Sequence, residues 1–501
     1  MSSKSSNRGS FATRLGIILA TAGSSVGLGN IWRFPVETGQ NGGAAFILIY
    51  LLCVIFLGVP MMTAEFIIGR RTHKDIASAY ESLSRLPSQS SHSASSDASR
   101  LKNFPIPRPH GESRRGAFQH FNLSTFQLFN LSTFNPGYAG MFCVTLILSY
   151  YSVVAGWVLK YAISAATGSL SAVTDTPAYF TDICTSTWSP LLFTLIFLLL
   201  THVIIVRGVQ NGIERFSKLM MPLLFIIMLL LAVGSLTMPG ASDGVRFLLQ
   251  PDFSKIDATV VLSALGQAFF SLSIAIGCLS TYASYFKPDV PLMKTAANVV
   301  GIDTLVAILS GFIIFPAVFS VEGVASDAGP GLVFVTLPNI FNSLFSNAPA
   351  VGYVFSLLFY LLLVLAALTS TISMHEEVTA FFVDRLSFGR RQAAICMTGV
   401  CMVLGALCSL SFGPLADFRP FFGLGFFDAF DALTAQWIMP LSGIVLSLFV
   451  GWRLPKSLVI EELTNHHTLR LPTWLFHGFF FIIRWLAPIA ITLIFLNELL
   501  Y

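Results

Sequence analysis

Long runs of apolar residues dominate the chain, and they recur at a length that suits the crossing of a lipid bilayer. A hydrocarbon core of roughly 30 Å requires about 20 apolar residues in helical form. The pattern predicts eleven such spans, with approximate centres at residues 24, 57, 152, 198, 225, 272, 310, 365, 402, 436 and 484. Hydrophobic residues make up 54% of the chain and charged residues 11%, unlike a soluble protein. The expected fold class is therefore an all-α polytopic membrane protein.

Two of these spans are interrupted by small and polar residues at mid-depth. The first reads RLGIILATAGSSVGLGNIWRFP (residues 14–35), and the second reads LSALGQAFFSLSIAIGCLSTYASY (residues 262–285). Gly, Ser and Asn weaken a helix and leave backbone amides and carbonyls free. Within a membrane such groups are tolerated where they line a cavity or bind a ligand. Two interruptions at matching places in two halves of the chain indicate a transporter with a solute and ion site at mid-membrane.

The distribution of Arg and Lys predicts the orientation. Basic residues precede the first span and follow the second, fourth and eighth spans, whereas residues 167–188 and 320–346 contain none. Because cytoplasmic loops are enriched in Lys and Arg, the N-terminus is expected in the cytoplasm. An odd number of spans then places the C-terminus outside. No cleavable signal peptide is expected, because the first apolar segment carries the interrupted motif.

Three regions are expected along the chain. Residues 1–12 form a cytoplasmic tail, residues 13–452 a transporter core of ten spans, and residues 453–501 a connector with the eleventh span. The core contains one segment of different composition, residues 81–136, which is rich in Ser, Pro and Arg. Such a composition buries too little apolar surface to order itself, so this segment is expected to be a disordered cytoplasmic loop.

Several longer motifs occur in a fixed order: ATRLGIILATAGSSVGLGNIWRFP, NGGAAFILIYLL, GQAFFSLS, TYASY, GPGLVFVTLPNIF and LTSTIS. In these motifs the chain resembles the neurotransmitter:sodium symporter family, and in particular its bacterial amino-acid transporters with eleven spans. The resemblance runs from about Arg8 to Trp452 and is broken mainly by residues 81–136. It implies a LeuT-like fold of two inverted five-helix repeats, spans one to five and six to ten, with broken helices 1 and 6. Substrate and two sodium ions are expected between the repeats.

The resemblance assigns the substrate and ion sites to the interrupted spans. It implies that the amides of Leu28 and Gly29 and the hydroxyl of Tyr151 hold a substrate carboxylate. The substrate-binding residues so nominated are Ser25, Leu28, Gly29, Ile147, Tyr151, Phe270, Ser271, Ser273, Ile276, Ser370 and Met374, with Ser373 beside them.

The resemblance also implies two sodium sites, and sodium requires oxygen ligands in a compact arrangement. The first sodium site is expected at Ser25, Asn30, Ser271 and Asp303, together with the substrate carboxylate. The second is expected at Gly23, Val26, Ala366, Thr369 and Ser370.

Asp303 is an acid in an otherwise apolar span, where a carboxylate without a partner is costly. In chloride-dependent relatives the resemblance places chloride near positions that match Tyr50, Gln267, Ser271 and Ala307. Ala307 has no hydroxyl group, and Asp303 lies one helical turn before it. We therefore expect the charge of Asp303 to replace chloride, so that no chloride is required. A rival hypothesis makes Asp303 a protonatable group in a proton-coupled amino-acid transporter.

Two charge pairs are expected to close the site. The resemblance implies an outer gate of Arg33 and Asp431, with Asp428 as a competitor, above Phe270 and Tyr151. It implies an inner gate of Arg8 and Asp384, with Tyr285 nearby.

The side-chain pocket that the resemblance nominates is mostly apolar, which favours a neutral hydrophobic or aromatic amino acid. Ala275 replaces a glycine that is commoner in the family, and it is expected to make the second interruption less pliable. This substitution places bulky substrates such as Trp in question.

These features predict sodium-coupled, chloride-independent import of a neutral amino acid by alternating access in a bacterial inner membrane. No phosphate loop, nucleophile arrangement or metal-ligand cluster is recognisable, so enzymatic activity is not expected. The expected partners are the substrate and the lipid bilayer, with no nucleic acid and no obligate protein partner. A channel is disfavoured because the polar residues cluster at one depth. A transporter-like solute sensor remains an alternative, which flux measurements would distinguish.

Overall fold

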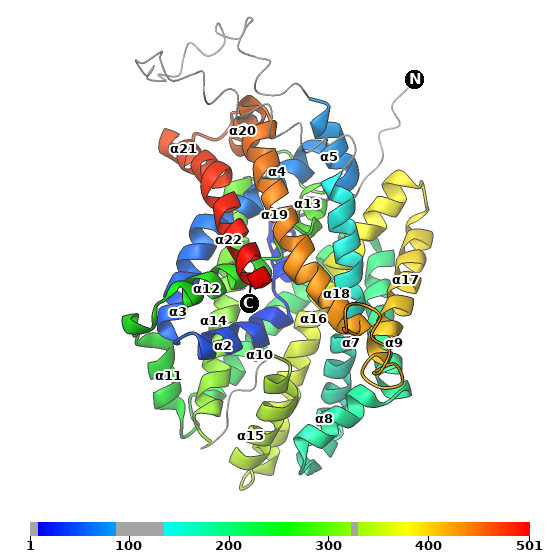
Figure 1. Ribbon diagram of the computed structural model, residues 1–501, viewed down its shortest axis with the longest axis vertical. Coiled ribbons are helices and arrows are strands. Elements are labelled where there is room, and N and C mark those ends of the chain that lie inside the picture. The colour runs from blue at the N-terminus through cyan, green and yellow to red at the C-terminus, as the bar shows by residue number, and fades with distance from the viewer. Residues whose placement is uncertain (1–8, 87–134, 322–328, 501) are drawn as a thin grey trace, which may run out of the picture.

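The computed structural model describes residues 9–86, 135–321 and 329–500. Throughout these residues the chain forms helices, and the only strand-like pairing is an isolated bridge between Phe421 and Leu424. Figure 1 shows helices from distant parts of the chain packed side by side, such as α12 (Ala258–Ser271) against α3 (Ala44–Cys53).

The first half of the chain contains the helices α1 (Arg14–Ser25), η1 (Gly29–Arg33), α2 (Phe34–Gln40), α3 (Ala44–Cys53), η2 (Val54–Gly58), α4 (Val59–Thr72), α5 (Ile76–Ser84), α7 (Pro136–Ala166), η5 (Ser169–Ala172), α8 (Thr176–Thr185), α9 (Trp188–Val206), η6 (Val209–Glu214), α10 (Arg215–Ser235) and α11 (Ala241–Leu249). The second half contains η7 (Phe253–Lys255), α12 (Ala258–Ser271), α13 (Cys278–Ala283), α14 (Leu292–Val318), η8 (Leu332–Thr336), α15 (Leu337–Leu344), α16 (Pro349–Arg385), α17 (Arg390–Leu410), α18 (Phe426–Ala432), η9 (Leu433–Ile438), α19 (Met439–Leu448), η10 (Phe449–Arg453), α20 (Lys456–Leu463), α21 (Thr473–Phe481), η11 (Ile482–Leu486) and α22 (Ala487–Leu500).

Nine continuous helices among the described residues are long and apolar enough to cross a membrane. A tenth span is the bent pair of α1 with η1 and α2, which changes direction by 60°. The predicted span near residue 272 is divided into two shorter helices, α12 and α13, so neither half reaches the length of a continuous span. The all-helical, multi-span architecture is therefore confirmed.

The first interruption lies between α1 and η1. The helix α1 begins at an N-cap, Thr13, whose side chain accepts a hydrogen bond from the amide of Gly16. It ends where Val26 takes an extended conformation, with φ −67° and ψ 108°. The chain then turns through Gly27 and Leu28 before the helical path resumes, and the amides of these two residues bond to side chains instead of to the helix.

The second interruption occupies residues 272–277, between α12 and α13. Ser273, Ala275 and Gly277 all have positive φ, at 51°, 71° and 100°. A left-handed conformation costs a residue with a Cβ atom about 1–2 kcal/mol, whereas glycine adopts it freely. Ala275 therefore holds a conformation that glycine would adopt at lower cost, in keeping with the expectation of a less pliable segment.

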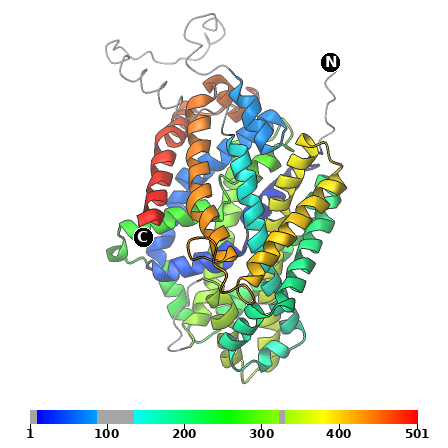
Figure 2. The same ribbon diagram turned by 45° about the vertical axis from the view of Figure 1, so that its right-hand side comes forward.

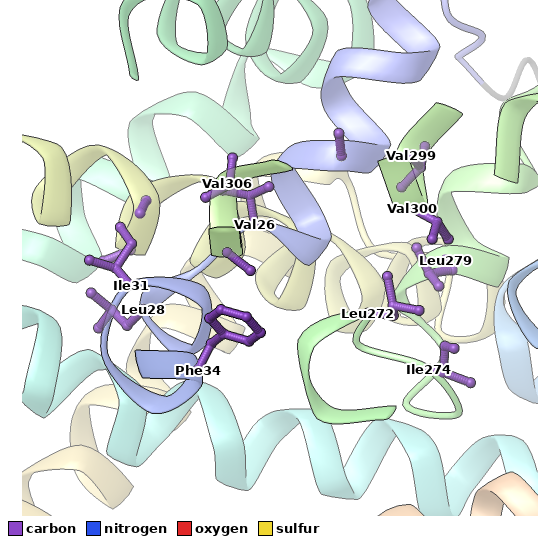
Figure 3. Packing of buried hydrophobic residues seen from close by; sticks show 14 of the residues in the cluster. Val26, Leu28, Ile31, Phe34, Leu272, Ile274, Leu279, Val299, Val300 and Val306 are labelled. Atoms are coloured by element: carbon purple, nitrogen blue, oxygen red, sulfur yellow. The ribbon is translucent and has the colours of Figure 1, made fainter. Parts of the chain in front are cut away.

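Buried apolar side chains fix both interruptions in place. Val26 and Leu28 of the first and Leu272 of the second are fully buried. Figure 3 shows these side chains in the core that they share with α14, which contributes Val306. Close packing of this kind leaves little freedom to the irregular backbone.

A group of long helices forms a scaffold beside the broken ones. The helix α16 packs against α7 and α17, and α9 packs against all three. Figure 2, in which the right-hand side of Figure 1 comes forward, shows α7 and α17 of this group from the front. The scaffold presents one face of α16 to α1 and another to α9.

The segment expected to be disordered, residues 81–136, is partly helical at its ends. The helix α5 continues to Ser84, and α7 begins at Pro136 with Asn135 as its N-cap. Glu81 holds this end of α5 through contacts with Arg385 at 2.8 Å and Arg85 at 2.5 Å. The arginines lower the pKa of the Glu81 carboxyl group, with the hydrogen bond from Arg385 as the largest cause. The expected boundary at Glu81 is thus wrong, and residues 87–134 lie outside the described part of the chain.

Candidate functional site

Two glycines allow close contacts around the first interruption. A Cβ atom at Gly27 would lie 2.6 Å from Oγ of Ser370, and one at Gly29 would lie 2.9 Å from the ring of Phe270. Between them, the amide of Leu28 donates a 3.1 Å hydrogen bond to the hydroxyl oxygen of Tyr151. The predicted carboxylate-binding groups of Leu28 and Tyr151 therefore meet at one point. A side chain larger than hydrogen at Gly27 or Gly29 would displace the neighbouring side chains of Ser370 or Phe270.

Asn30, Ser271 and Asp303 form one buried polar cluster, although they come from η1, α12 and α14. The Nδ2 atom of Asn30 lies 2.9 Å from Oγ of Ser271 and 2.8 Å from Oδ1 of Asp303. The Ser271 hydroxyl donates to Oδ2 of Asp303 at 2.7 Å. Asp303 is 0% exposed, so these donors rather than water satisfy its carboxyl oxygens. The three side chains supply neutral and anionic oxygen atoms of the kind that hard cations prefer.

The backbone of the first interruption orients Asn30. Its side-chain Oδ1 atom accepts a 3.0 Å hydrogen bond from the amide of Gly27. Its backbone carbonyl oxygen accepts a 2.7 Å hydrogen bond from the hydroxyl of Ser310. Ser25 joins the two interruptions, because its hydroxyl donates to the carbonyl of Leu272 at 3.3 Å. The residues predicted for the first sodium site are thus brought together.

The residues predicted for the second sodium site also meet, between α1 and α16. The hydroxyls of Thr369 and Ser370 lie 3.3 Å and 3.1 Å from the carbonyl oxygen of Val26. Thr369 also lies 2.9 Å from the carbonyl oxygen of Ala366. A Cβ atom at Gly23 would lie 3.2 Å from Cβ of Thr369, which places this glycine on the same wall. The arrangement offers two hydroxyl and two carbonyl oxygens within a small volume.

Tyr50 and Gln267 lie beside the cluster that contains Asp303. The Tyr50 hydroxyl is 3.4 Å from Oγ of Ser271. Both polar atoms of the Gln267 side chain are buried without a hydrogen-bond partner among the described residues. Ala307 is fully buried one turn after Asp303. Within this set the carboxylate of Asp303 is the anionic group that faces Ser271.

The predicted side-chain pocket is an apolar cluster. Ile276 and Met374 belong to one buried group, against which Ile147 and Tyr151 pack. The hydroxyl of Ser373 is turned back to the carbonyl of Ser370 at 2.8 Å. In the same way, the hydroxyl of Ser273 lies 3.4 Å from the carbonyl of Ser24. The hydroxyls of Ser273 and Ser373 are therefore directed at backbone carbonyls.

Arg33, one member of the predicted outer gate, contacts an acid on its own helical path and an aromatic ring. Arg33 approaches Glu37 at 3.6 Å and stacks over the ring of Phe270, with 4.2 Å from Cζ to the ring centroid. Within the described ranges Arg33 and Asp431 form no ion pair in this conformation, and their role as the outer gate stays a prediction. Glu37 lies one helical turn after Arg33, and this local partner competes with the distant acid. The hydroxyl of Ser263 also binds Glu37, at 2.5 Å.

The inner gate is only partly described, because Arg8 lies outside the described residues. Asp384 accepts a hydrogen bond from the amide of Asp75 at 3.0 Å. The hydroxyl of Tyr285 donates to Oε1 of Glu376 at 2.7 Å, and Arg390 pairs with Oε2 of Glu376 at 2.5 Å. We call this group of Tyr285, Glu376 and Arg390 the inner latch. It joins α16 to α17 and to the residues that follow α13.

Sequence reasoning missed two buried acids that hold the broken helices. Glu65 of α4 accepts hydrogen bonds from the amides of Ala275 and Ser280, the latter at 3.2 Å. Glu214 of η6 accepts from the amide of Ala12 at 2.6 Å and from the Thr13 hydroxyl at 2.8 Å. Glu376 is a third missed acid. Glu65 and Glu376 each stand in apolar sequence, the same signal that identified Asp303.

Comparisons with known proteins identify the family. The Sodium:neurotransmitter symporter family matches residues 8–88 and 189–501. A relative from Bacillus subtilis, the uncharacterized sodium-dependent transporter YhdH, is 35% identical over 97% of each chain. An uncharacterized sodium-dependent transporter from Haemophilus influenzae is 30% identical over the full length of both chains.

A solved structure extends the agreement to the fold. The crystal structure of MhsT in complex with L-phenylalanine has a TM-score of 0.78 and 37% sequence identity, and the match covers 98% of this chain and all of MhsT. The recognition of the family and of the LeuT-like fold is thereby confirmed. The chain belongs to the sodium:neurotransmitter symporter family and is a sodium-dependent membrane symporter.

Proposed function

We propose that the protein imports a neutral amino acid with a hydrophobic or aromatic side chain, driven by the sodium gradient and without chloride. The observation that carries the proposal is the meeting of Asn30, Ser271 and Asp303 beside the amide of Leu28. A substrate carboxylate at this place would bind the Leu28 amide and the Tyr151 hydroxyl, and it would also face the ion. Shared binding of this kind couples the affinities for ion and substrate.

The apolar surroundings of Ile147, Ile276 and Met374 support a neutral, hydrophobic side chain. MhsT, which is 37% identical, is solved with L-phenylalanine. We therefore name L-phenylalanine as the first probe. The strained conformation of Ala275 favours a compact aromatic or branched aliphatic substrate over Trp.

Two sodium ions are assigned, one to each oxygen cluster. Ser25, Asn30, Ser271 and Asp303 would hold the first, and Gly23, Val26, Ala366, Thr369 and Ser370 the second. The second cluster joins α1 to α16, so an ion there would fasten a broken helix to the scaffold. The carboxylate of Asp303 supplies a fixed negative charge near Tyr50, Gln267 and Ser271, which supports transport without chloride.

Alternating access would use the two gates. On the outer side, Arg33 would move between Glu37 and Asp431 above Phe270 and Tyr151. On the inner side, the latch would open together with the predicted pair of Arg8 and Asp384. The clusters of Arg and Lys support a cytoplasmic N-terminus and an external C-terminus, in the inner membrane of a bacterium.

Equilibrium binding to the purified protein tests the proposal. Labelled L-phenylalanine is offered in Na⁺ or in K⁺, with chloride or gluconate as the anion, and the other amino acids serve as competitors. We expect binding in Na⁺ with either anion, and competition by hydrophobic amino acids. Equal binding in K⁺ would contradict sodium coupling, and loss of binding in gluconate would contradict chloride independence. Competition restricted to charged amino acids would contradict the proposed substrate class.

A further inference from the structure

Glu377 of α16 is a buried acid that none of the sites above uses. It is 1% exposed, and neither carboxyl oxygen has a hydrogen-bond partner among the described residues. The thiol of Cys278 approaches the carboxyl group without the geometry of a hydrogen bond. A buried carboxylate without donors costs several kcal/mol, whereas the neutral acid costs far less. The surroundings of Glu377 in this conformation therefore suit a protonated carboxyl group.

Glu65 provides a contrast on the same backbone segment. Its carboxylate accepts hydrogen bonds from the amides of Ala275 and Ser280, which bracket the start of α13. Two acids thus contact one irregular segment, but only Glu65 receives donors there. The difference argues that Glu65 holds the segment as an anion and that Glu377 does not.

The groups that face Glu377 are neutral or acidic. Cys278 of α13, Cys143 of α7, Glu65 of α4 and Asp75 before α5 are the titratable side chains that act on it in the described part of the chain. On α16 itself, the neighbouring Glu376 belongs to the inner latch, where it forms an ion pair with Arg390. Among the described residues, therefore, no cation compensates Glu377.

The surroundings of Glu377 depend on the conformation of the second interruption. A Cβ atom at Gly277 would lie 2.5 Å from Oε1 of Glu377, so the carboxyl group rests against the backbone of that residue. Gly277 has φ 100° and precedes α13, and α13 is followed by Tyr285 of the inner latch. Opening of the latch with a movement of α13 would give water on that side a path to Glu377.

We propose that Glu377 is a proton-binding site coupled to the transport cycle. The carboxyl group is protonated while residues 272–277 close over it. When the inner latch opens, its O–H bond breaks and the proton passes to the entering water. The carboxylate takes up a proton again from the external water, after the inner latch has closed and before residues 272–277 close over it, so each cycle carries a proton across the membrane. This inference rests on the proposed function, since it adds proton movement to the same sodium-driven cycle.

The test uses the full-length protein in proteoliposomes with a Na⁺ gradient, labelled L-phenylalanine as the probe and a pH-sensitive dye in the lumen. Uptake is measured from about pH 5.5 to about pH 8.5. For the unaltered protein we expect a pH-dependent rate and a Na⁺-dependent dye signal. Glu377→Gln resembles the protonated acid, so we expect continued uptake with loss of both the pH dependence and the dye signal. Glu81→Gln, which removes an acid outside the spans, is the control and should behave as the unaltered protein.

A second variant keeps the test informative if Glu377→Gln does not fold. Cys278→Ser places a stronger donor beside Glu377 and stabilises its anion, so the midpoint of the pH profile should move to lower pH by about one unit. An unshifted profile in Cys278→Ser, or an unchanged profile and dye signal in Glu377→Gln, would overturn the assignment. Sodium-driven uptake without any proton signal in the unaltered protein would overturn only this inference. Absence of uptake altogether would instead count against the proposed function.

Discussion

The Nδ2 atom of Asn30 lies 2.8 Å from Oδ1 of Asp303, although the two residues are 273 positions apart. One stands at the interruption of the first span and the other in the middle of α14. This contact ties the irregular backbone to a continuous helix in the core. It also directs the carbonyl oxygen of the Asn30 side chain to the amide of Gly27, which fixes the path of the chain there.

Replacing Asp303 by Asn tests the role of its charge. The change preserves the size of the side chain and some of its hydrogen bonds, but it removes the anion. A hydrogen bond to a charged group contributes about 1.5–3 kcal/mol, so the apparent Na⁺ affinity should fall by about tenfold or more. We also expect added chloride to restore part of the activity. Na⁺ titrations of substrate binding in chloride and in gluconate measure both effects, and identical titrations for variant and parent would refute the role.

Two threonine hydroxyls on α16 allow a test of whether the second oxygen cluster binds sodium or only packs α1 against α16. Thr369→Ala removes an oxygen 3.3 Å from the carbonyl of Val26, and it should weaken the Na⁺ dependence of transport by about tenfold. Thr371→Ala is the matched control, because its hydroxyl faces Thr201 of α9 at 2.9 Å. We expect the control to lose some thermal stability with its Na⁺ dependence intact. Equal shifts in the Na⁺ dependence of both variants would show that the hydroxyls act only through packing.

The positive φ values of the second interruption predict opposite effects of two substitutions. Ala275→Gly relieves a left-handed conformation at φ 71° and should raise stability by about 0.5–1 kcal/mol. Gly277→Ala introduces strain at φ 100° and a clash with Glu377, so it should lower stability by more than 1 kcal/mol. Gly301→Ala in α14 is the control, since a Cβ atom there meets nothing within 4 Å. Thermal unfolding of the purified variants measures all three, and a destabilised Ala275→Gly would be the contrary result.

The inner latch predicts a change in the accessibility of a native cysteine. Glu376→Gln removes the charge that pairs with Arg390 at 2.5 Å and weakens the contact of Tyr285. The latch should then open more often, so that thiol reagents react faster with Cys278, which is fully buried in this structure. The rate of labelling is compared with and without the additional change Cys278→Ala. Labelling of Cys278 at the parental rate would mean that the inner latch does not control the access of reagents to this cysteine.

The sequence predicted the clusters whose residues stand out as polar groups in apolar spans. It missed the contacts that depend on which distant side chains the fold brings within hydrogen-bond or ion-pair distance. Asn30, Asp303 and Thr369 stand out because polar groups in apolar spans need a partner, and the family resemblance then grouped them. Arg33 illustrates the limit. Its local partner Glu37 is visible in the sequence at a spacing of one turn, but only the folded arrangement decides between Glu37 and Asp431.

Glu65 escaped notice for a different reason. Its role is to accept hydrogen bonds from the amides of Ala275 and Ser280. Amides freed by an interruption can be predicted, but the side chain that satisfies them lies 210 positions away in the sequence. A systematic search for acids within apolar spans would have found Glu65, Glu376 and Glu377 together with Asp303.

The measurement that tests the central claim most directly is uptake of labelled L-phenylalanine into proteoliposomes, with an inward gradient of Na⁺ compared with K⁺ or choline. The proposed function predicts accumulation above the external concentration only with the Na⁺ gradient, and its collapse when a sodium ionophore dissipates that gradient. Na⁺-dependent binding without accumulation would contradict it and would indicate a sensor. Accumulation driven by a proton gradient in the absence of Na⁺ would contradict sodium coupling.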